Sequence, residues 1–299
     1  MSTSNLQYLD PKVVSKLSSL DLIARLVVEG FMTGLHKSPY HGFSVEFAEH
    51  RQYMPGDPLK HVDWKLYGKS DRFFVKMFEE ETNLRSHLLL DVSASMGYAS
   101  PGRLTKLQYA AYLAAALATL MLMQQDAVGL LTFRDRVEKL IPPRASRPHL
   151  KLLLGELERA RPAAGTKMGA SLEHLAERVK RRGLIILMSD LLDEPSSVLR
   201  GLKHFRHRQH EVVVFHILDP YEISFPFRNE SGFIDLETGE EITTQPWEIA
   251  EQYRARFEAW SRAYERACLE NRIEYVRLST ETPYDVALLR YLEKRKRFY

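Results

Sequence analysis

Residues 85–97 read RSHLLLDVSASMG, and the predicted fold is built around this stretch. The four residues from His87 to Leu90 show no alternation with polar side chains, which predicts a strand buried on both faces. The strand ends at Asp91, and Ser93 and Ser95 follow within four positions. One tight loop therefore offers a carboxylate and two hydroxyls at the end of a buried strand.

A metal ion held by only these three groups would be incompletely coordinated, and two later residues are candidates to complete its shell. Thr166 lies in AAGTKMGAS, and Asp190 ends the second continuous apolar run, GLIILMSD. If both apolar runs are parallel strands, their carboxyl ends meet at the same sheet edge. All of these ligands are hard oxygens, which favour Mg²⁺, Mn²⁺ or Ca²⁺ over zinc or copper.

In order and in structural setting, this set resembles the metal-ion-dependent adhesion site of von Willebrand factor A-type domains. The five matching residues are Asp91, Ser93, Ser95, Thr166 and Asp190. On the residues alone, the alternative is that Asp91 and the serines merely cap the turn that follows the strand.

Composition and charge narrow the class of protein. The chain has 299 residues with 44% hydrophobic content, enough for a large core, and its net charge of +3 comes from interspersed charges of both signs. A dedicated nucleic-acid binder would concentrate its basic residues on one face.

The single cysteine, Cys268, excludes disulfides and cysteine-built metal sites within one chain, so we expect a cytoplasmic protein. We expect no signal peptide and no membrane span, because the most apolar segment, Tyr109–Met123, is shorter than the roughly 20 residues a span needs.

Helical and strand patterns alternate after the central stretch, which predicts a doubly wound α/β fold with a mostly parallel sheet. Residues 84–299 are expected to form this von Willebrand A-like domain, with an antiparallel strand at VEKLI and a β-hairpin inserted near 225–245 around Thr238 and Gly239. Residues 1–83 are expected to form an extension with a helix from Pro11 to Gly30 and an edge strand in RFFVKMFEEET.

The loop 51–65 is dense in charged and aromatic residues, and by itself it is typical of a surface turn around Pro55 and Gly56. The order Tyr53-x-x-Gly56-Asp57, Asp63-Trp64 and VKMFEEET before LLLDVSASM resembles the bacterial family called domain of unknown function 58. That resemblance implies a von Willebrand A-like domain behind an N-terminal segment. Unlike some relatives, the protein is expected to have no N-terminal membrane helices, and the sequence keeps all five metal-site positions.

Two classes of function follow from these residues. In the favoured one, the protein is not an enzyme: the ion recruits an Asp or Glu of a partner protein, and Met96 and Tyr98 contribute to the contact surface. The resemblance implies that this partner is a MoxR-type AAA+ ATPase and that the pair assembles or matures other proteins. The alternative is a metal-dependent phosphoesterase, which would need a general base or a second metal. The only further carboxylates near these strand ends are Asp193 and Glu194.

Other motifs are weak. Three histidines in KHFRHRQH could hold zinc, but the flanking basic residues favour a solvated helix face. They are His204, His207 and His210. The sequence has no Walker-type glycine loop, and neither serine of the metal loop lies in a Gly-x-Ser-x-Gly motif.

Overall fold

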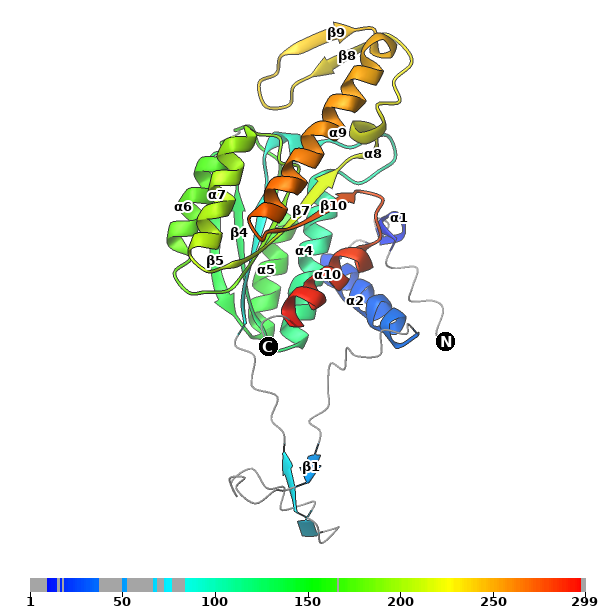
Figure 1. Ribbon diagram of the computed structural model, residues 1–299. Helices are drawn as coiled ribbons and strands as arrows, with labels where there is room; N and C mark the ends of the chain where they lie inside the picture. The colour runs from blue at the N-terminus through cyan, green and yellow to red at the C-terminus, as the bar shows by residue number, and fades with distance from the viewer. Residues whose placement is uncertain are drawn as a thin grey trace.

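The computed structural model describes residues 10–14, 17, 19–37, 50–52, 67–68, 73–76, 84–165 and 167–296. The largest part of this structure is a six-stranded sheet covered by helices on both faces (Figure 1).

The sheet is parallel except at one edge. In spatial order its strands are β10 (Glu274–Ser279), β7 (Glu211–Leu218), β6 (Leu184–Ser189), β3 (Arg85–Asp91), β4 (Ala127–Phe133) and β5 (Val137–Arg144). The neighbouring pairs are parallel except β4 and β5, which are antiparallel. Strand β3 is therefore central, and the predicted doubly wound, mostly parallel α/β architecture with one antiparallel edge is confirmed.

Alternation along the strands separates two cores. On β3, Leu88 and Leu90 face one core and Leu89 the other. The first core is covered by α1 (Pro11–Val14), α2 (Leu20–Lys37), α4 (Lys106–Met123), α5 (Arg147–Arg159) and α10 (Tyr284–Lys296). The second is covered by α6 (Met168–Arg178), α7 (Pro195–His207) and α9 (Pro246–Glu270). Because both faces are buried, the strands carry the continuous apolar runs seen in the sequence.

Helix α4 fixes the loop that follows β3. It begins with a capping box, in which the Thr105 side chain accepts from the Gln108 amide and the Gln108 side chain accepts from the Thr105 amide. Among the described helices it is the one long and apolar enough to cross a membrane, yet 78% of that apolar window is buried inside the protein. It is a core helix, as the sequence predicts.

The inserted hairpin also forms where expected. Strands β8 (Ser231–Ile234) and β9 (Glu241–Thr244) pair antiparallel, and Gly239 adopts a left-handed φ of 77° in the turn. The short helix α8 (Pro220–Ser224) precedes the hairpin. In Figure 1 the hairpin lies beyond the sheet, next to the start of α9.

The N-terminal region differs from its prediction in two ways. The expected helix from Pro11 to Gly30 is instead α1 followed by α2, and α2 passes through the buried Gly30 to Lys37. Residues 50–52, which were expected to lie in a loop, form β1 (His50–Gln52), which pairs with β2 (Phe74–Lys76). The pairing partner lies more than 20 residues away, so a local turn pattern does not reveal it. Of the loop 51–65, the other residues quoted above, from Tyr53 to Trp64, lie outside the described part of the chain.

The predicted boundary after residue 83 does not separate two cores. Helix α2 contributes Ile23, Val27 and Phe31, each with 1% exposure or less, to the core that contains α4 and the sheet. The start of the predicted extension therefore shares its hydrophobic core with residues 84–299.

Candidate functional site

The site lies where the sheet changes its winding direction. From β3 the chain proceeds to β4 on one side, and it later returns to β6 on the other side of β3. In open α/β sheets, ligands bind at the carboxyl ends of the strands at such a switch point. Asp91 ends β3 and Asp190 directly follows β6, so the two predicted carboxylates flank this point.

Hydrogen bonds hold the loop after β3 in place. Asp91 accepts from the Ser93 amide at 2.9 Å and from the Ser189 hydroxyl at 2.6 Å. The hydroxyl oxygens of Ser93 and Ser95 are 3.1 Å apart. A short helical turn, η3 (Ala94–Gly97), then carries the chain toward α4. The carboxylate and both hydroxyls predicted from the sequence are thus brought together.

The two carboxylates are buried, and their negative charges repel each other. Asp91 and Asp190 are each only 1% exposed. Burial and the neighbouring charge of Asp190 raise the pKa of Asp91 to about 7. Burial also disfavours ionisation of Asp190, but the Lys106 ammonium and a hydrogen bond from Ser95 lower its pKa overall. The site therefore has an excess of negative charge that a bound cation would relieve.

Sequence reasoning missed the buried cation Lys106. Its Nζ lies 2.7 Å from Asp190 Oδ2 and 2.5 Å from Glu222 Oε1, and the residue is fully buried. Burial alone would lower the pKa of Lys106, but the two carboxylates raise it. The only signal in the sequence is a lysine at the first position of a long apolar helix, and its partner Glu222 is 116 residues away.

A second missed residue comes from the inserted hairpin. The Glu237 carboxylate accepts from the Ser95 amide at 3.0 Å and from the Gly165 amide at 2.8 Å. An acidic side chain from a distant turn thus lies directly on the loop with the predicted metal ligands. Nothing in the local sequence of the hairpin distinguishes Glu237 from the neighbouring Glu240 and Glu241.

The donor set fits a hard divalent cation. Its atoms are carboxylate and hydroxyl oxygens, and burial together with the charge of Asp190 raises the pKa of Asp91, so a cation would favour its ionised form. Among the described residues, no three His, Cys, Asp or Glu side chains are grouped closely enough to hold a metal. Any ion here would therefore depend on the serine hydroxyls beside Asp91 and Asp190. Thr166 lies outside the described residues, next to Gly165 and Lys167, which are described.

Other predicted residues have structural roles. Met96 was expected on a partner surface, but this is wrong: its side chain is fully buried in the core under α4. An apolar side chain on a one-turn helix packs inward when a core helix follows. Tyr98 is half-buried, and burial together with Asp219 and Glu222 raises its pKa to about 12.

The remaining candidates contribute backbone contacts. Asp193 Oδ2 accepts from the Gly169 amide at 3.3 Å, and Glu194 caps α7 by accepting from the Ser197 amide at 2.8 Å. His210 is buried, with Nε2 3.1 Å from the Val179 carbonyl oxygen. Neither carboxylate is poised as a free base over the loop.

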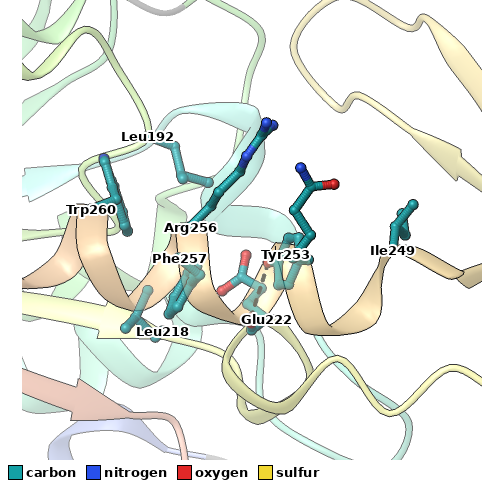
Figure 2. A pocket seen from close by; sticks show the side chains of 9 residues that line it. Leu192, Leu218, Glu222, Ile249, Tyr253, Arg256, Phe257 and Trp260 are labelled. Carbon is teal, nitrogen blue, oxygen red and sulfur yellow. Dashed lines mark hydrogen bonds between the residues drawn. The ribbon is translucent and has the colours of Figure 1, made fainter. Parts of the chain in front are cut away.

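A cavity of about 520 Å³ adjoins the Lys106 and Glu222 pair. Figure 2 shows its largely apolar side chains, which project from α9, from α8, from the end of β7 and from the loop that follows β6. They include Leu192, Leu218, Ile249, Tyr253, Phe257 and Trp260. The polar lining residues are Glu222, Gln252 and Arg256, and Glu222 connects the cavity to the buried charges because it pairs with Lys106.

Similar proteins extend over most of the chain. The uncharacterized proteins Rv1480 of Mycobacterium tuberculosis and Mb1516 of Mycobacterium bovis are 27% identical over 233 residues, 77% of this chain and 73% of theirs. Among solved structures, BatB from Bacteroides thetaiotaomicron is 18% identical with a TM-score of 0.48, covering 72% of this chain and 99% of that one. The SpRpn10 VWA domain is 13% identical with a TM-score of 0.39, covering 69% of this chain and 93% of that one.

A family model also matches most of the chain. The family described as "Protein of unknown function DUF58" matches residues 49–267. This range includes the 51–65 loop, the Asp-x-Ser-x-Ser loop and the inserted hairpin. The chain therefore belongs to the DUF58 family, as its sequence resemblance predicts.

Proposed function

We propose that this protein is a non-enzymatic interaction module that captures a carboxylate of a partner protein through a bound divalent ion. One observation carries the proposal: two buried carboxylates and two serine hydroxyls converge at the switch point of the sheet. Such a shell supplies few charges and leaves an ion electrophilic toward an incoming carboxylate.

The residues proposed to hold the ion are Asp91, Ser93, Ser95, Thr166 and Asp190, with Mg²⁺ or Mn²⁺ preferred and Ca²⁺ as the other hard candidate. We expect the ion to bind weakly, because the Lys106 ammonium lies 2.7 Å from Asp190 and already neutralises its charge. The ion has to share Asp190 with this lysine, which reduces the attraction of the site for a cation.

The charges around the site favour binding over catalysis. Hydrolysis of a phosphoester would require a base beside the ion. Of the nearby carboxylates, Asp190 and Glu222 are paired with Lys106, and Glu237 accepts from two backbone amides. Each of these groups is therefore engaged by a protein donor instead of being available to a water molecule.

For the partner we propose a MoxR-type AAA+ ATPase that supplies an Asp or Glu, in keeping with the resemblance stated above. Tyr98 and Leu192, together with the apolar cavity beside Glu222, provide the adjoining contact surface. Leu192 is 42% exposed only two residues after Asp190, so it suits an apolar contact next to the carboxylate.

The experiment titrates the full-length chain with Mn²⁺ by calorimetry and measures binding to a purified MoxR-type ATPase with and without chelator. Asp91→Ala should abolish ion binding, and Thr166→Ala should weaken partner binding without unfolding the protein. Glu230→Ala, at an exposed position on the hairpin, is the control and should change neither. Equal Mn²⁺ affinity in Asp91→Ala would refute the site. Metal-dependent phosphoester turnover that is lost in Asp91→Ala would favour the enzyme instead.

A further inference from the structure

The inserted hairpin is held firmly enough to place its turn on the site. Phe225, which adopts a left-handed φ of 47°, stacks on Tyr253 of α9 with ring centroids 4.3 Å apart. It also stacks on Phe233 of β8 at 5.6 Å, and Phe227 packs edge-on against both phenylalanines. This aromatic cluster ties the base of the hairpin to a helix of the main domain.

The turn itself directs Glu237. Asp235 Oδ1 accepts from the amides of Glu237 at 2.8 Å and Thr238 at 3.3 Å, and the Gly239 amide donates to the Asp235 carbonyl at 2.8 Å. An Asp that bonds the backbone in this way fixes the turn geometry. Glu237 is half-buried, whereas Glu240 and Glu241 on the same hairpin are exposed.

The receiving amides belong to two loops that are distant in sequence. Ser95 follows β3, and Gly165 lies between α5 and α6, yet their amides donate to the two different oxygens of one carboxylate. Gly165 has φ +130°, a conformation that L side chains rarely adopt, and an added Cβ would lie 2.9 Å from Asp135 Cγ. One of the two amides therefore belongs to a position whose backbone conformation and surroundings accept only glycine.

We propose that the Ser95 and Gly165 amides form the carboxylate-recognition half of the ion site, and that Glu237 occupies it in the isolated chain. Glu237 would supply in cis the acidic side chain that a partner supplies in trans. The ligand class is thus an Asp or Glu side chain that accepts from both amides beside the ion. This inference rests on the proposed function and adds that a partner carboxylate must displace Glu237.

The exchange is chemically balanced. One carboxylate leaves and another enters, so the charge of the site and the number of hydrogen bonds to the amides are conserved. The tethered Glu237 competes at an effective concentration that is set by the hairpin, of order millimolar for a short tether. Removal of Glu237 should therefore strengthen the binding of an added carboxylate without any new contact.

The first test needs no metal. Amide hydrogen exchange of Ser95 and Gly165 is followed by NMR in the full-length chain, in Glu237→Ala and in the matched control Glu240→Ala. A lost charge-assisted hydrogen bond should accelerate exchange at both amides about tenfold in Glu237→Ala only. Unchanged exchange at both amides in Glu237→Ala would overturn the proposal.

The second test uses acetate as the carboxylate probe. Shifts of the Ser95 and Gly165 amide resonances are titrated with acetate, with and without saturating Mn²⁺. Glu237→Ala should bind acetate at these amides, while the unaltered chain and Glu240→Ala should bind it at least tenfold more weakly. Equal acetate binding in all three chains would overturn the assignment of Glu237 as occupant.

The two proposals fail separately. If no variant binds Mn²⁺ but Glu237→Ala shows faster exchange and metal-free acetate binding, the carboxylate pocket stands and the ion-dependent function fails. If Mn²⁺ binds and is lost in Asp91→Ala, yet exchange and acetate binding do not respond to Glu237→Ala, the ion site stands and the role of Glu237 is refuted.

Discussion

Replacement of Lys106 with methionine should destabilise the metal-free protein more than any surface substitution. Methionine keeps most of the buried length of the side chain, so the change removes the ammonium and little packing. The substitution removes two ion pairs from a fully buried position: Lys106 Nζ lies 2.7 Å from Asp190 Oδ2 and 2.5 Å from Glu222 Oε1. Removal of one partner from a buried ion pair costs about 3 to 5 kcal/mol, because a buried charge is left without compensation.

The assay is urea unfolding followed by circular dichroism in the presence of chelator. Lys151→Met, an exposed lysine on α5, is the matched control and should stay within about 0.5 kcal/mol of the unaltered chain. The second substitution Asp190→Asn should recover part of the loss, because it removes one of the uncompensated charges. The deficit should also shrink from about pH 8 to about pH 5, since burial without Lys106 raises the pKa of Asp190 and protonation then relieves the charge.

Divalent ions should have the opposite effect on the same variant and stabilise it. Without Lys106, Asp190 is free to coordinate, so Mn²⁺ should bind Lys106→Met more tightly than the unaltered chain and restore part of its stability. A loss below about 1 kcal/mol with no pH dependence would refute the argument that Lys106 neutralises a buried charge.

The other predictions concern single positions. Asp91→Asn should stabilise the chelator-treated protein at neutral pH by on the order of 2 kcal/mol in urea unfolding, because it removes a buried charge whose pKa is raised, while calorimetry should show that Mn²⁺ binding is lost. Burial lowers the pKa of His87 to about 4, so the unfolded chain binds a proton that the folded chain does not, and the contribution of His87 to stability should fall by about 3 kcal/mol between about pH 6.5 and pH 4; urea unfolding of His87→Phe should lack this component of the pH profile. Gly129→Ala should cost several kcal/mol or prevent folding, as judged by soluble expression and thermal melts, because its Cβ would lie 2.6 Å from the Ile141 carbonyl oxygen. Phe31→Ala should cost about 3 to 5 kcal/mol in urea unfolding, and a loss below 1 kcal/mol would show that α2 is not part of the main core.

Local patterns were sufficient for the fold because its central strands are buried on both faces. The apolar runs that end at Asp91 and Ser189 became β3 and β6 almost residue for residue. Helix ends were less well defined, as at α2, which continues past the predicted end at Gly30 to Lys37. Such ends depend on fraying and on caps that a periodic pattern does not define.

The site could be predicted only as far as its ligands follow strands. Asp91 and Asp190 were found because the carboxyl ends of parallel strands meet at one edge. Lys106, Glu222 and Glu237 could not be found, since their pairing depends on tertiary contacts across 72 to 142 residues of sequence. A buried lysine or a turn glutamate has the same local pattern as an exposed one, so only the folded structure reveals what it contacts.

The antiparallel edge strand β5 bears on how the chain behaves in concentrated solution. An unprotected sheet edge can recruit a strand from another molecule and so begin aggregation. In β5, Pro142 and Pro143 offer no amide hydrogen, and the register with β4 shifts between Val128 and Leu130. These irregularities interrupt the ladder that an incoming strand would need. A strand from another molecule therefore finds no regular series of hydrogen-bonding groups along β5, although the central strands of the sheet are almost entirely apolar.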